Sequence, residues 1–334
     1  MKGICNNDKN KIKKKLTKCP ICFSQEIKYK FSTGDIEYHV VDQIFDIYFC
    51  KKCKAYFINP IPKENEIGKF YEFHNYSSYG AYKGINPEIK YSKIDRLLIN
   101  KKNITFKDRI YFSIRGIDNR ILDLVMYKNN KHIIFQNVLD VGCGSGFFTK
   151  WLIKYLKISK NNIRGIDIFS EVKKFGKTMG VKMECTTLQK YPESGFDLIT
   201  LSHVLEHEPK PKMMIEQIYN KLSKNGIFYL SVPNSRSLPA LLFGAKWICH
   251  SVPRHIYSFS KKSIIEITKR LFQLEYYSSG DFARFMFSRY NRLKPWMIFF
   301  NTPVHQKLKI NRLVDLFLIL FNLGDSQSFI FKKK

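Results

Sequence analysis

Four short apolar runs alternate with amphipathic segments in the second half of the chain. The runs cover residues 137–141, 163–168, 196–201 and 227–232. Short buried runs separated by helix-periodic segments are typical of βαβ units, in which parallel strands alternate with helices. A helix from Lys261 and further strands near residues 274–277 and 327–331 complete the pattern. It predicts an α/β fold whose parallel sheet carries helices on both faces.

The chain divides by composition into four consecutive parts. Residues 1–18 are polar and lysine-rich and are expected to form a flexible basic leader. Residues 19–62 hold two cysteine pairs and end in closely spaced prolines, which stop regular structure. Residues 63–130 are expected to be a helical, aromatic-rich linker. The α/β pattern fills residues 131–334. It contains an aromatic-rich insertion at about 281–324, which is open to interpretation as a lid, an oligomer contact, a membrane-peripheral face or part of the core.

The cysteine pairs have metal-ligand spacing. They are two Cys-x-x-Cys turns, formed by Cys19, Cys22, Cys50 and Cys53. Four thiolates on two tight turns can close a tetrahedral zinc site, which is then structural because no coordination position stays open. Apolar and polar positions alternate between the pairs, at Ile36, Tyr38 and Val40 and again at Phe45, Ile47 and Phe49, which predicts strands. We therefore predict a zinc-ribbon-like module.

Cysteine usage also bears on location. Tight pairs suit metal binding in a reducing cytoplasm better than disulfides. The first 18 residues lack the apolar core of a secretory signal, and no apolar stretch reaches the length of a membrane span. A cytoplasmic protein is expected.

Three alternating glycines, Gly142, Gly144 and Gly146, join a predicted strand to a predicted helix. Glycine is needed where the backbone takes positive φ or where a ligand approaches it closely. A dinucleotide-binding loop would place its third glycine at position 147, which is Phe147. The spacing therefore favours a cofactor without phosphates.

An acidic residue follows at the distance that a nucleoside cofactor requires. Asp167 ends the next apolar run, 21 residues after Gly146. A carboxylate at the end of the second strand can accept both hydroxyls of a ribose. A glycine turn and an unrelated surface aspartate would explain each feature alone, but the combination predicts a cofactor site.

Five segments in order resemble the motifs of class I S-adenosylmethionine (SAM)-dependent methyltransferases. They are DVGCGSG at residues 140–146, GID at 165–167, FDLITLSHVLEH at 196–207, LSKNG at 222–226 and PRHIYSFS at 253–260. The resemblance covers residues 133–280. It implies a Rossmann-like class I methyltransferase sheet, SAM as cofactor and methyl transfer as the activity.

The resemblance also implies which residues bind SAM. The glycines would hold the methionine end of SAM. Asp140 would hold the loop or the ammonium group of SAM, and Asp167 would hold its ribose. Leu188 would flank the adenine ring, and Ser202 and His203 would line the methionine side. The implied residues are Asp140, Gly142, Gly144, Gly146, Asp167, Leu188, Ser202 and His203.

Three polar residues are candidates for catalysis. A base matters in methyl transfer when the acceptor is a hydroxyl or a carbon that must lose a proton. His207 follows the fourth strand, where the active site of the family opens; Glu206 could orient it, and His255 could reach the same cleft. The alternative is that these histidines cap or bond local backbone groups.

Residues 203–207 also match the H-x-x-E-H pattern of certain zinc proteases. In that pattern two histidines on one helical face bind zinc. Here the residues directly follow a buried strand, and Pro209 and Pro211 shorten any helix. The protease interpretation is therefore disfavoured.

The formal net charge of +29 leaves two classes of acceptor open. Such a charge attracts anionic partners, including nucleotide-linked sugars and nucleic acid. An RNA methyltransferase is the alternative, although Ser202-His203 stands where base amino-group methylation requires an Asn/Asp-Pro-Pro-aromatic run. A binding protein on a decayed methyltransferase frame is disfavoured by the intact glycine loop.

The order of the parts resembles a particular subgroup of these enzymes. A zinc segment, the Asn59-Pro60-Ile61-Pro62 stretch, a tyrosine-rich stretch and a SAM domain are similar to methyltransferases of sugar and polysaccharide biosynthesis. This implies a nucleotide-linked sugar or a polysaccharide unit as methyl acceptor, and a linker at residues 63–130 that helps to shape the substrate cleft. Tyr76 and Tyr79 are then candidates for substrate binding, with exposed loop aromatics as the alternative.

Overall fold

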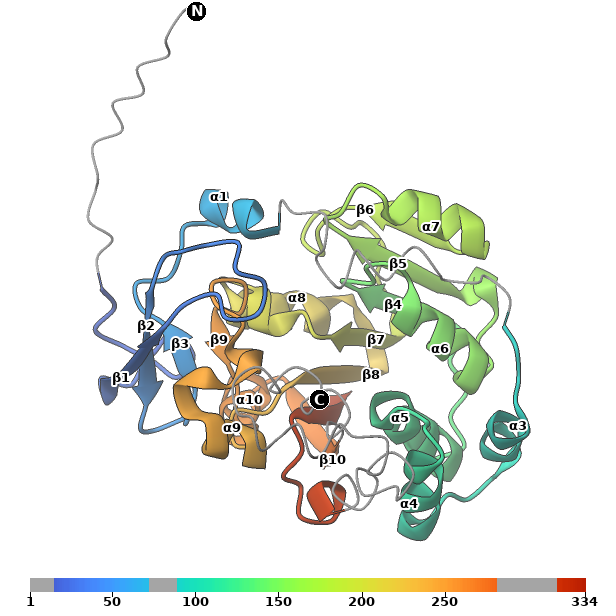
Figure 1. Cartoon of the computed structure of the whole chain (residues 1–334). Helices are drawn as coiled ribbons and strands as arrows, with labels where there is room; N and C mark the ends of the chain where they lie inside the picture. Colours follow the sequence, from blue (N-terminus) through green and yellow to red (C-terminus); the bar gives the residue numbers. More distant parts are fainter. Residues whose placement is uncertain (1–14, 72–88, 281–316) are drawn as a thin grey trace, which may run out of the picture.

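The computed structural model describes residues 15–71, 89–280 and 317–334 (Figure 1). Its centre is a seven-stranded sheet in the order β10-β11-β8-β7-β4-β5-β6. Strands β4 to β8 are parallel, and β11 lies antiparallel between β8 and β10. The strands of this sheet are β4 (Val138–Val141), β5 (Ile163–Asp167), β6 (Lys182–Cys185), β7 (Phe196–Ser202), β8 (Leu222–Pro233), β10 (Phe272–Gly280) and β11 (Ser326–Lys333).

Every strand predicted for the second half of the chain is present, and one more strand of this sheet was missed. Strand β6 has the sequence KMEC, in which only Met183 is buried. It lies at the edge of the sheet. A short edge strand with one apolar residue has no periodic signal that the sequence could reveal.

Helices cover both faces of the sheet, as the pattern predicts. One core includes β7 residue Leu198 and residues of α5 (Asn119–Asn130), α6 (Phe147–Leu156) and α7 (Val172–Met179). The opposite core includes β7 residues Ile199 and Leu201 with residues of α8 (Pro211–Lys221) and α10 (Lys261–Thr268). Successive strand residues face opposite sides of a sheet, so each face buries its own apolar set. The predicted Rossmann-like α/β fold is confirmed.

A second, smaller sheet joins the cysteine-containing segment to the rest of the chain (Figure 1). Its order is β1-β2-β3-β9. Three of its strands come from the N-terminal segment, namely β1 (Ile27–Thr33), β2 (Phe45–Cys50) and β3 (Tyr56–Ile58). The fourth strand, β9 (Tyr257–Ser258), comes from the second half of the chain. The N-terminal module therefore shares a sheet with a segment of the methyltransferase-like region.

One predicted strand of this module is wrong. The alternating residues Ile36, Tyr38 and Val40 lie in the connection between β1 and β2, outside any strand. The Asp35 carboxylate accepts the backbone N–H groups of Tyr38 and Val40 at 3.1 and 3.0 Å, which folds the chain into a turn. Local side-chain-to-backbone bonds of this kind compete with strand pairing.

The segment before the large sheet is helical where the structure describes it. Its helices α3 (Lys93–Asn100) and α4 (Phe106–Ile114) begin at capping boxes built on Ser92 and Thr105. Asp95 of α3 also accepts bonds from Lys154 and Tyr155 of α6. These helices are thus tied to the large sheet.

The remaining elements are short. They are α1 (Glu64–Ile67), α9 (Leu238–Phe243) and the 3₁₀ turns η1 (Gly68–Tyr71), η3 (Lys160–Asn162), η4 (Leu205–His207), η5 (Gly244–Lys246) and η6 (Ile248–His250). Among the residues described, none of the helices combines the length and apolarity needed to cross a bilayer. Tyr76, Tyr79 and most of the aromatic-rich insertion lie outside the described residues.

Candidate functional site

The glycine loop connects β4 to α6 in a conformation that only glycine adopts easily. Gly142, Gly144 and Gly146 have φ values of +68°, +50° and +79°. A Cβ atom at Gly142 would lie 2.3 Å from Cγ2 of Val204, and one at Gly146 would lie 2.6 Å from Sδ of Met179. Backbone conformation and space therefore both require glycine. The N–H groups of Gly142 and Cys143 donate to the carbonyl of Ile166 and that of Gly146 to the carbonyl of Cys143, which fixes the shape of the loop.

Asp140 stabilises this loop from within the fold. It is 1% exposed, and its two carboxylate oxygens accept hydrogen bonds from the hydroxyls of Thr149 and Thr200 at 2.6 and 2.7 Å. Burial raises the pKa of Asp140 to about 6, although these two bonds oppose that shift. The side chain thus connects β4 to α6 and to β7.

Asp167 stands at the carboxyl end of β5, next to the glycine loop. Its Oδ2 atom accepts the N–H of Gly144 at 2.8 Å, and its Oδ1 atom accepts the N–H of Phe169 at 3.0 Å. Burial raises its pKa, while these backbone bonds lower it. Because a carboxylate has about four lone-pair sites, each oxygen keeps one for a further donor such as a ribose hydroxyl.

Of the other predicted cofactor residues, two lie at the edge of the sheet and one lies in the hydrophobic core. Ser202 ends β7 and His203 follows it, so both lie near the glycine loop at the carboxyl edge of the sheet. Leu188 is 3% exposed and belongs to the core that includes Ile166 and Leu201. Its predicted contact with adenine stays a prediction.

Arg120 is a candidate site residue that the sequence did not reveal. It is the second residue of α5, and one guanidinium nitrogen lies 3.5 Å from the hydroxyl of Ser202. Asp118 holds the guanidinium through two bonds of 2.9 Å, and the ring of Trp151 lies 5.4 Å below it. A cation in the first turn opposes the helix dipole. That local conflict is the one sequence signal that could have drawn attention to it.

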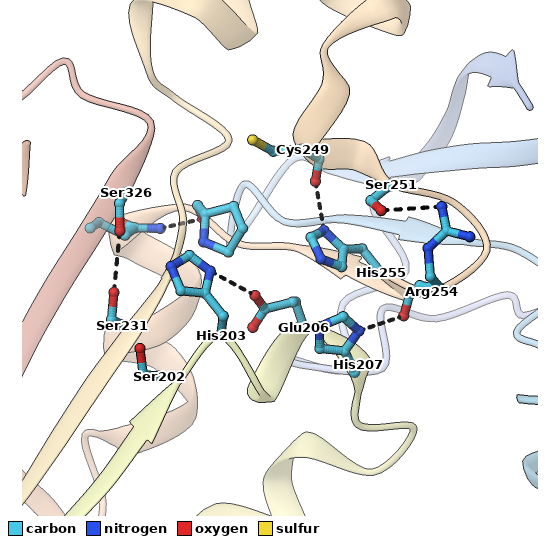
Figure 2. A network of polar contacts seen from close by, with 12 residues as sticks. Ser202, His203, Glu206, His207, Ser231, Cys249, Ser251, Arg254, His255 and Ser326 are labelled. Atoms are coloured by element: carbon cyan, nitrogen blue, oxygen red, sulfur yellow. Dashed lines mark hydrogen bonds and ion pairs between the residues drawn. The ribbon is translucent and has the colours of Figure 1, made fainter. Parts of the chain in front are cut away.

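Figure 2 shows a second polar group after β7, centred on Glu206. Glu206 is fully buried, and its Oε1 atom lies 3.2 Å from Nδ1 of His203. The rings of His207 and His255 lie 4.6 Å apart, centroid to centroid. The structure therefore brings the three predicted catalytic residues together, although 49 positions separate Glu206 from His255.

Backbone carbonyl groups set the orientation of both histidine rings. Nδ1 of His255 lies 2.7 Å from the carbonyl oxygen of Cys249, and Nδ1 of His207 lies 3.1 Å from that of Arg254. A carbonyl oxygen only accepts, so each Nδ1 carries the proton and each Nε2 keeps a lone pair. The hydroxyl of Tyr71, 2.8 Å from Nδ1 of His207, then accepts from the same N–H.

The electrostatics of the group keep these rings neutral. Desolvation, together with the nearby His255, lowers the pKa of His207 to about 4, and desolvation also lowers that of His255. Burial opposes ionisation of Glu206, but its bond with His203 and its interactions with the three surrounding histidines together outweigh burial, so its pKa lies below the ordinary value. At neutral pH the group therefore offers two neutral imidazoles beside a carboxylate.

The same group could also hold a metal ion, but not in the protease arrangement. One potential ligand atom from each of Glu206, His207 and His255 lies within 4.8 Å of the others. His203 is not part of this set, and the 3₁₀ turn η4 begins only at Leu205. The two histidines of the H-x-x-E-H pattern do not share a helical face, so the protease interpretation is wrong.

The four cysteines of the N-terminal module form one cluster. Their sulfur atoms lie within 4.8 Å of one another, with Cys19 and Cys53 at 3.6 Å and Cys22 and Cys50 at 3.6 Å. Disulfide sulfurs are about 2.05 Å apart, whereas zinc–sulfur bonds of about 2.3 Å in a tetrahedron place sulfurs about 3.8 Å apart. The separation fits a zinc ion held by four thiolates.

Comparisons with known proteins point to one family. A family described as "Methyltransferase domain" matches residues 92–276, more than half of the chain. The Ubiquinone biosynthesis O-methyltransferase of Actinobacillus pleuropneumoniae serotype 7 (strain AP76) is 28% identical over 156 residues, covering 42% of this chain and 64% of that protein. Its counterpart from Coxiella burnetii (strain Dugway 5J108-111) is 26% identical over 137 residues, covering 38% and 56%. The chain thus spans less than two thirds of the length of these relatives.

Two solved structures are also similar. The N-methyltransferase NodS from Bradyrhizobium japonicum WM9, in complex with S-adenosyl-L-homocysteine, aligns with 73% of this chain and 97% of its own at 14% identity and a TM-score of 0.40. The 1,6-didemethyltoxoflavin-N1-methyltransferase from Burkholderia thailandensis aligns with 89% and 98% at 13% identity and a TM-score of 0.45. On the match to residues 92–276, the chain belongs to the methyltransferase-domain family.

Proposed function

We propose that the protein transfers a methyl group from SAM to a small-molecule or glycan acceptor, a nucleotide-linked sugar or a polysaccharide unit being the leading candidate. The observation that carries the proposal is the glycine loop together with Asp167, whose carboxylate is bonded to the N–H of Gly144. SAM supplies a methyl group on a positively charged sulfur, and the transfer is an in-line displacement in which positioning provides most of the catalysis.

Each residue near the loop has a distinct role in this proposal. The glycine loop and Arg120 would hold the methionine end, with the guanidinium pairing to its carboxylate. Asp167 would accept the ribose hydroxyls, Leu188 would flank adenine, and Ser202 and His203 would line the methionine side. Asp140 keeps the loop in shape through its two threonines.

On the acceptor side, we propose His207 as the group that removes a proton from the acceptor. A general base must be neutral and must offer a lone pair, and the bond to the Arg254 carbonyl leaves that lone pair on Nε2. Glu206 and His255 lie beside it, and the Glu206 carboxylate would stabilise the imidazolium that forms. A metal ion shared by the three residues is the rival explanation of the same geometry.

Replacing His207 with asparagine is expected to lower kcat by about 100-fold or more, while the Kd for SAM stays within about twofold. Since the pKa of His207 is about 4, wild-type activity should be constant from about pH 5.5 to 8 and fall only in stronger acid. Initial rates over this range test both points. Loss of activity near pH 6.5, or complete loss after treatment with EDTA and recovery with a divalent cation, would argue against the general base.

The class of acceptor is tested by label transfer from methyl-tritiated SAM. The full-length protein is offered a nucleotide-sugar and glycan extract, total RNA and 3,4-dihydroxybenzoate in separate reactions. Label in the sugar fraction is the expected result. Label in RNA would support the alternative, in which the net charge of +29 holds nucleic acid. Label in the phenol would instead indicate O-methylation of an aromatic hydroxyl. Absence of SAM binding would favour a binding protein.

For the N-terminal module we propose a structural zinc ion on Cys19, Cys22, Cys50 and Cys53. The sulfur separations support it. The bond between Cys19 and Cys53 lowers the pKa of the former to about 6 and raises that of the latter, so a metal is needed for all four to be thiolates. Cysteine thiolates stay reduced in a reducing compartment, so we propose that the protein is located in the cytoplasm.

A further inference from the structure

The segment 250–260 carries His255 and the Arg254 carbonyl that orients His207, and the N-terminal module holds this segment along its length. Strand β3 pairs with β9, and the N–H of Ile58 donates to the carbonyl of Ile256 at 3.0 Å. Near the end of the segment, the hydroxyl of Ser260 donates to the carbonyl of Cys53 at 3.1 Å. The second cysteine turn is therefore tied directly to the segment.

The strongest of these contacts is a buried ion pair. Two guanidinium nitrogens of Arg254 donate to the two carboxylate oxygens of Asp35, at 2.6 and 3.1 Å. Both side chains are 0% exposed. The Tyr38 ring packs 4.4 Å from the guanidinium, and Asp35 is itself fixed by the N–H groups of Tyr38 and Val40. A bidentate pair fixes orientation as well as distance, because both planar groups must align.

The other side of the segment faces the proposed acceptor site. Figure 2 shows the Arg254 side chain turned toward Ser251 while its backbone carbonyl points at His207. The N–H of Ile256 also donates to the carbonyl of Glu206 at 2.8 Å. The segment is thus held between the N-terminal module and the turn that carries Glu206 and His207.

We propose that Asp35 is a positioning residue for the methyl-acceptor site. Through its ion pair it fixes the backbone of Arg254, whose carbonyl then keeps the proton of His207 on Nδ1 and presents Nε2 to the acceptor. The N-terminal module would thus contribute to catalysis by positioning the Arg254 carbonyl, and would not be an independently acting domain. The proposal rests on the proposed function insofar as His207 acts on the acceptor.

The test is a nuclear magnetic resonance measurement that needs no acceptor. Full-length protein labelled with ring-¹⁵N histidine is saturated with S-adenosylhomocysteine, and the His207 signals are assigned with the H207N variant. In the wild type, the ring nitrogens should show the Nδ1–H form. In Asp35→Asn, the carboxylate charge is lost at nearly constant shape, and the signals should move toward the average of the two tautomers. Affinity for S-adenosylhomocysteine should stay within about twofold.

A matched control comes from the same module. Asp46 in β2 pairs with Lys15 at 2.9 Å and is 34% exposed, so Asp46→Asn should leave the His207 signals unchanged. Should Asp35→Asn fail to fold, Arg254→Lys keeps a cation but loses the paired geometry, and the same shift is expected. Unchanged His207 signals in a folded variant of the pair would overturn the proposal.

The measurement also separates this proposal from the proposed function. If the wild type does not bind S-adenosylhomocysteine, methyl transfer is contradicted, yet the tautomer comparison in the free protein still decides the role of Asp35. Once an acceptor has been identified by label transfer, Asp35→Asn should lower kcat about tenfold or more with little change in the KM for SAM. If Asp35→Asn lowered kcat and the amount of S-adenosylhomocysteine bound per mole of protein by the same factor, the role of Asp35 would be merely structural.

Discussion

Replacing Asp167 with alanine is expected to weaken SAM binding by about 100-fold. Hydrogen bonds to a charged group contribute about 1.5–3 kcal/mol each, and about 1.4 kcal/mol corresponds to a factor of ten in Kd. Two ribose hydroxyls on one carboxylate therefore give an effect of that size. The substitution also removes the acceptor of the Gly144 N–H, which loosens the glycine loop. Isothermal titration calorimetry with SAM and with S-adenosylhomocysteine measures the change.

Two further variants make this experiment specific. Asp167→Asn keeps an acceptor for one backbone N–H but loses the charge, so it should bind SAM with intermediate affinity. Arg120→Ala should weaken SAM binding about tenfold or more, because the partner of the methionine carboxylate is lost. Methylthioadenosine lacks that carboxylate, so its affinity should respond to Asp167→Ala and not to Arg120→Ala. Unchanged affinity of Asp167→Ala for both ligands would refute the assignment of Asp167.

Replacing Cys50 with serine is expected to abolish zinc binding and to destabilise the whole chain. Structural zinc contributes on the order of 10 kcal/mol in isolated zinc-finger peptides. Cys50 and Cys53 are buried in the same core as Leu201 and Phe228 of the large sheet, so loosening the module disturbs that core. We expect the Tm to fall by about 10 °C or more. Metal analysis of the purified protein and thermal unfolding measure the two effects.

The matched control is Cys185→Ser. Cys185 is exposed and lies outside the four-sulfur cluster, so this variant should keep one zinc per chain and the wild-type Tm. Addition of a chelator to the wild type should reproduce the loss of stability seen in Cys50→Ser. A wild-type protein that contains no zinc, with a Cys50→Ser variant of unchanged Tm, would contradict the metal site.

Local features of the sequence determined the fold class and the framework of the cofactor site. Strands β4, β5, β7 and β8 were predicted because buried strands need continuous apolar runs. The glycine loop was predictable because positive φ angles and close contacts allow only glycine at those positions. Asp167 followed from its distance along the chain. The cysteine pairs were visible because metal ligands on tight turns have fixed spacing.

The sequence failed where a local pattern had more than one physical explanation. The alternation at Ile36, Tyr38 and Val40 has the period of a strand, but Asp35 binds the backbone N–H groups that a strand would use for pairing. At residues 203–207, by contrast, the sequence itself disfavoured the helical metal site that the H-x-x-E-H spacing matches, because Pro209 and Pro211 shorten any helix. There the chain instead leaves β7 with His203 at a φ of +56°, so the two histidines separate.

Tertiary structure alone decided how the proposed acceptor side and the proposed methionine side of the site are assembled. Asp35 and Arg254 are 219 positions apart, Tyr71 and His207 are 136 apart, and Arg120 and Ser202 are 82 apart. Periodicity and spacing report only neighbours along the chain, so contacts of this range leave no pattern in a single sequence. The sequence determined that a methyltransferase sheet with a glycine loop would form. The packing of the N-terminal module against residues 250–260 decided which side chains meet there, because the sheet that unites β3 with β9 exists only in the folded chain.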